Sequence, residues 1–333
     1  MKKSLRIATY LLATIIALLA MGCEPSSPKN SSSSSMIQNI YIEVGESPEA
    51  LQSRYGKSIE VNDKNPGSKF YTIDWSRPNL GEVTLKNGTS QVVFAHALGI
   101  MGSYNEDFPH DGLARYSLYL GLSATGTIAH DQARLQFYDM LNRLLKAGWQ
   151  RYLDDAEPRL ANAESIRRLL ETTTSITTLD PGYLPTLPEW MTLKERSSWQ
   201  FYKDHVYMDV RLSRDQNRMD PNLPGAYFVN ISLESYASKW RTLFGEADRP
   251  RWRELLLDEK ENAAQARTKT ERQLQAKGYH IDTDYRNPDE NEPLIDAPHS
   301  STPPPQSAPP SDAAVSQPPS SLKDRISRWF KND

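Results

Sequence analysis

The sequence contains a single cysteine, Cys23, among 333 residues. A disulfide bond needs a second thiol, so no intrachain disulfide can stabilise this chain, even in an oxidising compartment. The chain also lacks a large excess of charge of one sign, because its formal net charge is −3. A general nucleic-acid-binding protein would carry a strongly basic surface, and we therefore expect no nucleic-acid partner.

Long apolar runs are equally scarce, and only the N-terminal segment contains one. Lys2, Lys3 and Arg6 give this segment a basic start. Ile7–Met21 then holds no charged residue and ends in small residues before Cys23. A basic start, an apolar stretch and a small-residue cleavage site together predict an export signal. The run is shorter than the roughly 20 residues that a transmembrane helix needs.

The end of this segment, Ala20-Met21-Gly22-Cys23, resembles the lipobox of bacterial lipoproteins. A typical lipobox has Leu three positions before the cysteine, where this chain has Ala20, with Leu19 one step earlier. The resemblance implies that residues 1–22 are a signal peptide and that Cys23 becomes the lipidated first residue of the mature chain. The residues alone leave an ordinary secretory signal or an uncleaved anchor as alternatives.

The residues after the cysteine bear on location. In lipoproteins, Asp directly after the lipidated cysteine favours retention at the inner membrane. This chain has Glu24, so the resemblance implies anchorage in the outer membrane, with the fold facing the periplasm. Residues 23–36 are rich in serine, and Glu24–Ser35 contains no large apolar side chain. This composition predicts a flexible tether between the lipid and the fold.

Residues 37–104 are expected to form a small module of one helix and an antiparallel sheet. Ile40 and Ile42 alternate with polar neighbours, as in a strand with one buried face. Ser47 is expected to cap a helix that Gly56 ends. The module resembles that of SmpA/BamE-like envelope lipoproteins in its order of Val44, Gly45, Ser47, Leu51, Tyr55 and Gly56, followed by an aromatic strand.

Residues 113–285 are expected to form a larger mixed domain, so the predicted fold class is α+β. Alternating patterns predict strands over 116–122, 206–212 and 227–233, and helical patterns cover 127–147, 162–171 and 250–278. Gly148 and Gly278 each end a helix and precede an aromatic residue that starts an expected strand, at 149–153 and 279–281. The repetition fits a duplicated β-β-α-β unit, and it equally fits two ordinary glycine C-caps.

The C-terminal part of the chain divides into a linker and a short amphipathic segment. Residues 286–321 are rich in proline and serine, which predicts an extended, disordered linker. In residues 322–333, helical spacing would place Leu322, Ile326, Trp329 and Phe330 on one side. We expect this segment to bind by folding against an anionic membrane or a groove on a partner protein. Docking onto its own domain is the alternative.

The sequence lacks recognisable catalytic, metal-binding and nucleotide-binding motifs. The six histidines stand in no metal-ligand spacing, and no Gly-x-Ser-x-Gly element or nucleotide-binding loop occurs. We therefore assign no catalytic residue, no metal and no cofactor. The 7 Trp and 16 Tyr are abundant, which core packing explains for the most part and a recognition surface for the rest.

These observations favour protein binding over catalysis. The sequence predicts a lipid-anchored periplasmic protein that contacts the membrane through Cys23 and binds an unidentified protein. It would act as an inhibitor or immunity protein against a secreted toxin, or as an envelope assembly factor. The alternative is an envelope hydrolase acting on lipid or cell wall. A deep pocket with convergent ionisable side chains would favour the enzyme, and a broad aromatic or acidic patch would favour the binder.

Overall fold

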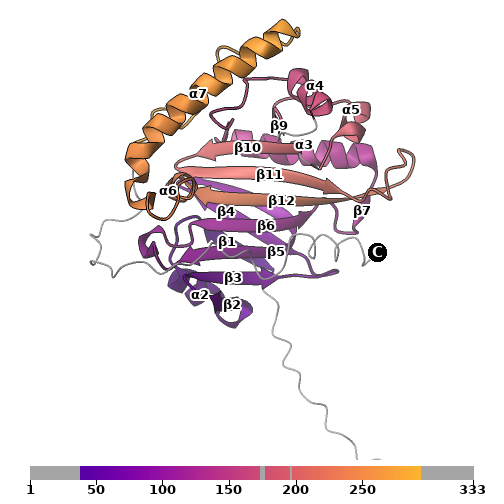
Figure 1. The fold of residues 1–333 in the computed structure, drawn as a ribbon. Helices are drawn as coiled ribbons and strands as arrows, with labels where there is room; N and C mark the ends of the chain where they lie inside the picture. Colours follow the sequence, from indigo (N-terminus) through magenta and orange to yellow (C-terminus); the bar gives the residue numbers. More distant parts are fainter. Residues whose placement is uncertain (1–37, 173–176, 196, 294–333) are drawn as a thin grey trace, which may run out of the picture. The chain divides into compact units, whose positions relative to one another are not determined.

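The computed structural model describes residues 38–172, 177–195 and 197–293, which all lie in one compact unit that begins at Ile37 (Figure 1). The strands are β1 (Asn39–Glu43), β2 (Glu60–Asn65), β3 (Ser68–Asp74), β4 (Gly81–Asn87), β5 (Ser90–Asn105), β6 (Arg115–Gly121), β7 (Thr127–Ile128), β8 (Gln150–Arg151), β9 (Thr177–Thr178), β10 (Ser197–Lys203), β11 (Val206–Arg214) and β12 (Gly225–Ser235). The helices are α2 (Pro48–Tyr55), α3 (His130–Lys146), α4 (Ala163–Glu171), α5 (Leu187–Thr192), α6 (Tyr236–Arg241) and α7 (Trp252–Ala276), with 3-10 turns η1 (Gly56–Ser58), η2 (Pro109–Asp111) and η3 (Arg249–Arg251).

The strands form one open, 12-stranded sheet in the order β1-β4-β5-β6-β12-β11-β10-β8. Strand β3 joins β2 to β5, while β7 pairs with β12 and β9 pairs with β10. The β1–β4 and β9–β10 pairs are parallel, and the other pairs are antiparallel. The sheet is therefore mixed, and the α+β class predicted from the sequence is confirmed.

The two regions expected as a small module and a larger domain contribute neighbouring strands to this sheet. Residues Ala97–Ser103 of β5 pair antiparallel with Arg115–Leu120 of β6. The chain between them makes a short turn that contains η2. Backbone hydrogen bonds therefore cross the expected boundary at residues 105–112, and the core on either side of it is one cluster of buried apolar side chains.

Local sequence signals explain the first elements. The side chain of Ser47 accepts a hydrogen bond from the Ala50 N–H at 3.2 Å, and Pro48 occupies the first turn of α2. Gly56 follows the helix with a φ of +49°, a conformation that suits a residue without a Cβ atom. Gly88, with a φ of +56°, lies in the turn between β4 and β5. The caps expected at Ser47 and Gly56 are confirmed.

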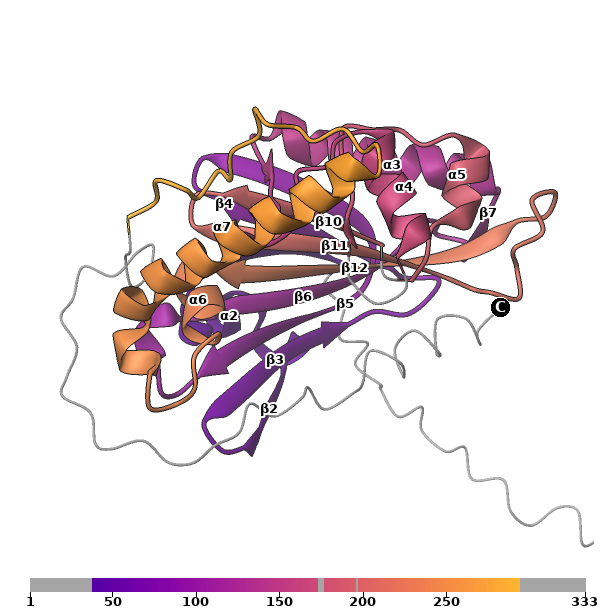
Figure 2. The ribbon, with the colours of Figure 1, turned by 45° about the horizontal axis from the view of Figure 1, so that its top comes forward.

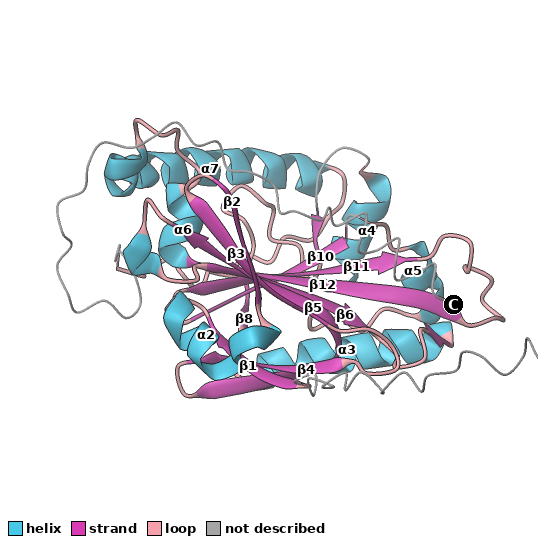
Figure 3. Ribbon diagram, turned by 90° about the horizontal axis from the view of Figure 1, so that it is seen from below, coloured by secondary structure: helices cyan, strands magenta, loops and turns pink. Residues whose placement is uncertain are grey.

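Helices cover the two faces of the sheet unequally. Buried side chains of α2, α3, α4 and α5 join one face in the main core. Helices α6 and α7 pack on the other face through a cluster rich in tyrosine and tryptophan. Figure 2 shows α7 crossing in front of β10 to β12, and Figure 3 shows α2 and α3 on the opposite side of the sheet from α6 and α7. The abundant aromatic residues are thus mainly core residues, as expected.

One expected helix boundary and one expected strand were wrong. Helix α3 begins at His130 because Thr127–Ile128 pair with β12 as the short strand β7. The strand expected at 279–281 does not form. The Tyr279 N–H instead donates to the Leu274 carbonyl oxygen at 3.0 Å, which completes the end of α7. The side chains of Tyr279 and Ile281 still lie buried, in a separate apolar cluster with Leu274.

Candidate functional site

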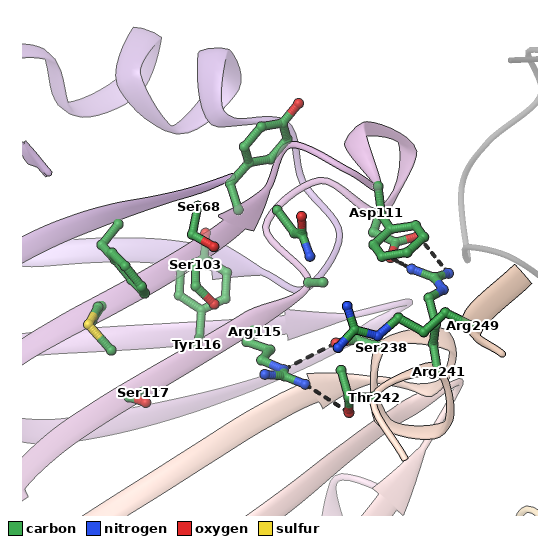
Figure 4. A pocket seen from close by; sticks show the side chains of 16 residues that line it. Ser68, Ser103, Asp111, Arg115, Tyr116, Ser117, Ser238, Arg241, Thr242 and Arg249 are labelled. Carbon is green, nitrogen blue, oxygen red and sulfur yellow. Dashed lines mark hydrogen bonds and ion pairs between the residues drawn. The ribbon is translucent and has the colours of Figure 1, made fainter. Parts of the chain in front are cut away.

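A cavity lined by several charged and polar side chains lies beside α6, on the face of the sheet that α6 and α7 partly cover (Figure 4). Its volume is about 330 Å³, within the range of small ligand sites. We call it the arginine pocket. It is lined by side chains from β3, β5, the η2 turn, β6, α6 and η3: Ser68, Phe70, Met101, Ser103, Tyr104, Asn105, Phe108, Asp111, Ala114, Arg115, Tyr116, Ser117, Ser238, Arg241, Thr242 and Arg249.

The strand register builds the floor of the pocket. Phe70 on β3 lies opposite Ser103 on β5, Ser103 lies opposite Arg115 on β6, and Arg115 lies opposite Glu234 on β12. These side chains form one row across four strands, with the Phe70 ring at one end and the Arg115–Glu234 ion pair at the other. Because side chains alternate along a strand, Ser117 shares this face with Arg115. The next row places Met101 opposite Ser117, which adds an apolar surface.

Arg115 is fixed by a network of acceptors. Its Nε donates to Glu234 Oε1 at 2.7 Å and to Ser238 Oγ at 3.1 Å. Its Nη2 donates to Thr242 Oγ1 at 3.1 Å and lies 2.6 Å from Glu234 Oε1. Ser238 and Thr242 reach Arg115 together because they lie four positions apart at the end of α6. The ion pair is half-exposed, so its main effect is to orient the guanidinium.

Arg241 makes the second ion pair, and this pair is buried. Its Nη1 donates to Asp111 Oδ2 and its Nη2 lies 3.4 Å from Asp111 Oδ1, so the contact is bidentate. The guanidinium also stacks on Phe108, with its Cζ atom 3.9 Å from the ring centroid. The side chains of Arg241 and Asp111 are only 6% and 8% exposed. This pair ties α6 to the η2 turn and closes one end of the pocket.

Arg249 completes the wall from η3. Its Nε donates to the Phe244 carbonyl oxygen at 3.4 Å. Within the described ranges, no carboxylate lies within ion-pair distance of its guanidinium, which distinguishes it from Arg115 and Arg241. Burial lowers the pKa of Arg253, the charge of Arg241 lowers it further, and the charge of Asp111 opposes both effects.

The lining offers hydrogen-bond donors and an apolar floor, with little capacity for proton transfer. It includes serine and threonine hydroxyls and three guanidinium groups, but no histidine, lysine or cysteine. Arginine stays protonated in proteins, and Asp111, the carboxylate of the lining, is held by Arg241. The arrangement therefore suits binding of an acceptor-rich group. Across the described ranges, no cluster of three or more His, Cys, Asp or Glu side chains could hold a metal ion.

A second hollow, of about 470 Å³, lies between α3 and strands β5 and β6. Its lining is mainly apolar, and it includes Phe94, Leu135 and Met140. Its charged residues, Asp139 and Arg143, form an exposed pair on one helix, with 3.6 Å between the charged atoms. Such a pair contributes little, so this hollow lacks the fixed donors of the arginine pocket.

None of the residues singled out in the sequence is among the lining residues of the arginine pocket. Cys23 and the terminal residues Leu322, Ile326, Trp329 and Phe330 lie outside the described residues. The described part of the chain contains no helix long and apolar enough to cross a membrane.

Sequence reasoning missed all the residues of the arginine pocket. Two faint signals pointed to them: Arg115 and Ser117 alternate with the buried residues of β6, and the residues Ser238, Arg241 and Thr242 follow helical spacing. Neither signal shows that these two elements meet.

A comparison with protein-family models, curated proteins and solved structures finds no match to this chain.

Proposed function

We propose that this protein is a lipid-anchored envelope protein that binds another protein in the periplasm, and that the arginine pocket is its recognition site. The observation that supports the proposal is a half-open pocket in which oriented guanidinium and hydroxyl donors surround an apolar floor. Arginine and aromatic residues dominate the energetic centres of protein interfaces.

The pocket does contain convergent ionisable side chains, the feature that would favour an enzyme. Their chemistry favours binding, because an arginine can act as neither acid nor base at physiological pH. Among the lining serines, Ser238 contacts a carboxylate, and its Oγ donates to Glu234 Oε1 at 2.9 Å. That same oxygen also accepts from Arg115 Nε at 2.7 Å, so it is already engaged in an ion pair. Hydrolysis of lipid or cell wall therefore remains the weaker alternative.

The anchor defines the setting of the proposed interaction. Lipidation at Cys23 would hold the fold at the periplasmic side of the outer membrane, with residues 24–36 as a tether. A guard against a secreted toxin and an envelope assembly factor both need such a position. Both act by contact with a protein, and the arginine pocket supplies a contact surface for either.

Site-specific crosslinking tests the recognition site. A photo-crosslinking residue at Ser103, within the pocket, should capture one protein in intact cells, and the adduct should disappear in Arg249→Glu. The control is the same crosslinker at Lys269, an exposed residue of α7. The captured protein, once purified, should bind the full chain and bind the Arg249→Glu variant more weakly. Identical adducts from both positions, or none from Ser103, would contradict the proposal.

The anchor has a separate test. Each buried CH₂ group contributes about 0.8 kcal/mol to membrane binding, and more than one acyl chain gives a stable attachment. Cys23→Ala should therefore abolish incorporation of labelled fatty acid and leave an unprocessed precursor. Label that persists in Cys23→Ala would show that the lipoprotein assignment is wrong, whatever the outcome of the crosslinking.

A further inference from the structure

The arginine pocket carries more positive than negative charge. Asp111 holds Arg241 and Glu234 holds Arg115. In the described part of the chain, Arg249 contacts only a backbone carbonyl oxygen. Three guanidinium groups are thus balanced by two carboxylates, and one positive charge is left uncompensated. A ligand with a single anionic group would balance this remaining positive charge.

Donors are available on two of the three arginines. Arg115 uses its Nε and Nη2 atoms for its contacts, which leaves Nη1. Arg249 uses only Nε, which leaves both Nη atoms. Figure 4 shows Arg249 extending past Ser238 toward Arg115, whereas Arg241 turns toward Asp111. The spare N–H groups therefore border the same space.

We propose that the arginine pocket binds the carboxylate of an Asp or Glu side chain of the partner protein, with an adjacent apolar residue of the partner on the floor formed by Phe70 and Met101. This inference rests on the proposed function. The carboxylate bridges the spare N–H groups of Arg249 and Arg115. Guanidinium–carboxylate pairs of this kind are planar and often bidentate, which gives direction as well as affinity.

The charge and size of the pocket favour a carboxylate over a phosphate group. A phosphorylated side chain carries a charge of roughly −1.5 to −2 at neutral pH, more than the single surplus positive charge. Excess negative charge would also lie near Asp111 and Glu234, where it is repelled. A volume of about 330 Å³ admits one or two side chains and excludes a whole helix.

Titration of the full chain in detergent micelles tests this inference. The probes are acetyl-Ala-Phe-Glu-Ala-amide, its Gln counterpart and inorganic phosphate, and the signals are the arginine Nε–Hε resonances in NMR spectra. The Glu peptide should shift the resonances of Arg115 and Arg249, and the Gln peptide should leave them in place. Equal binding of both peptides, or tighter binding of phosphate than of the Glu peptide, overturns the inference.

Two arginines on the same turn provide a matched pair of variants. Arg249→Gln should weaken the Glu peptide about tenfold or more, since it removes a charge-assisted hydrogen bond. Arg251→Gln removes the same charge from an exposed side chain outside the pocket, which pairs with Glu254 at 3.1 Å. It should leave affinity within about twofold, since this side chain does not line the pocket and its charge is already paired with Glu254. Equal losses of affinity in both variants overturn the inference. Arg249→Lys is a third variant, which keeps the positive charge of the side chain.

The two proposals fail in different ways. If the Glu peptide does not bind while the Ser103 crosslink still captures one protein, the carboxylate inference is wrong and the binding function stands. If the Glu peptide binds as expected and Ser103 captures nothing, the carboxylate specificity is supported and the protein-binding function is wrong.

Discussion

At the scale of single residues, two buried arginines differ in whether a carboxylate contacts the guanidinium group. Arg241 forms a bidentate pair with Asp111. Arg214 is 6% exposed and stacks over Trp190, with its Cζ atom 5.0 Å from the ring centroid. Its Nη1 and Nη2 atoms have no hydrogen-bond partner in the structure, and burial lowers its pKa. The guanidinium of Arg241 contacts a carboxylate, whereas that of Arg214 stacks on a ring and receives only partial compensation for its burial from the charges of Tyr227 and Glu195.

This contrast predicts opposite responses to the same substitution. Arg241→Met should lower the free energy of unfolding by about 3–5 kcal/mol, because it leaves the Asp111 carboxylate buried without its partner. Arg214→Met removes a buried guanidinium whose Nη atoms make no hydrogen bond and keeps an apolar stem, so stability should be unchanged or higher. Urea denaturation of both variants measures the difference. Comparable losses would show that Arg214 is stabilised by its surroundings, including the charge of Glu195, as strongly as Arg241 is by Asp111.

At the scale of secondary structure, the apolar side of the amphipathic helix α3 is buried in the core. Leu141 and Leu144 are fully buried, as their helical spacing predicted, whereas Leu135 on the same helix is 46% exposed. Leu141→Ala or Leu144→Ala should therefore lower the free energy of unfolding by about 2–5 kcal/mol. Leu135→Ala, the control, should cost less than about 1 kcal/mol. Thermal unfolding compares the three variants, and an unchanged transition in Leu141→Ala would contradict the packing of α3.

The C-terminal half of α7 is attached by one ion pair, a hydrogen bond from Arg267 Nη2 to the Asp154 carbonyl oxygen at 2.9 Å, and a small apolar cluster. Arg159 donates from Nε to Glu271 Oε1 at 2.9 Å and from Nη2 to Glu271 Oε2 at 2.8 Å. Burial by itself would raise the pKa of Glu271, but the hydrogen bonds and charge of Arg159 outweigh it and lower that pKa. The ionised carboxylate is thus stabilised more in the folded than in the unfolded chain.

The lowered pKa predicts a pH-dependent contribution to stability. The contribution is complete above the unfolded pKa of about 4.3 and is lost as the pH falls through the folded value. Glu271→Gln should cost about 1 kcal/mol at pH 7. The difference from the parent chain should shrink below about pH 4.3. Urea denaturation at pH 7 and at pH 3 measures it, and a constant difference between the two would contradict this role of Glu271.

At the scale of the whole molecule, the sheet unites segments that the sequence separates. Strand β5 pairs with β6 through the residues Ala97–Ser103, and side chains from β1 to β12 share one core. A fragment ending at residue 112 would keep β5 but lose its β6 partner. The arginine pocket depends on the same assembly, because Ser103 and Arg115 precede Ser238 by more than 100 residues.

We therefore predict that a fragment of residues 37–112 does not fold alone. It would expose the edge of β5 and its buried side chains Ile100 and Met101 to water. Circular dichroism and amide-proton dispersion in NMR should show an unfolded chain, while residues 37–293 should unfold in one cooperative transition. A folded fragment would instead establish the small module as an independent domain.

The sequence by itself determined much of the local structure. Alternation placed Ile40 and Ile42 in a buried strand, and Ser47 and Gly56 marked the ends of α2. These features depend on neighbours within a few residues, which a single sequence displays. The α+β class followed from the same patterns. The duplicated β-β-α-β unit and the lipid anchor stay predictions. The anchor rests on Cys23, which lies outside the described residues.

Only the tertiary structure decided what lies together. Thr127–Ile128 became a strand because β12 offered it a partner, against the helical pattern around it. Residues 279–281 lost their expected strand because Tyr279 completes the end of α7. The arginine pocket exists because strand register and the Arg241–Asp111 pair bring α6 to β6. The contacts of the arginine pocket join residues more than 100 positions apart, such as Arg115 with Ser238 and Asp111 with Arg241, and local propensity carries no information about pairs of that kind.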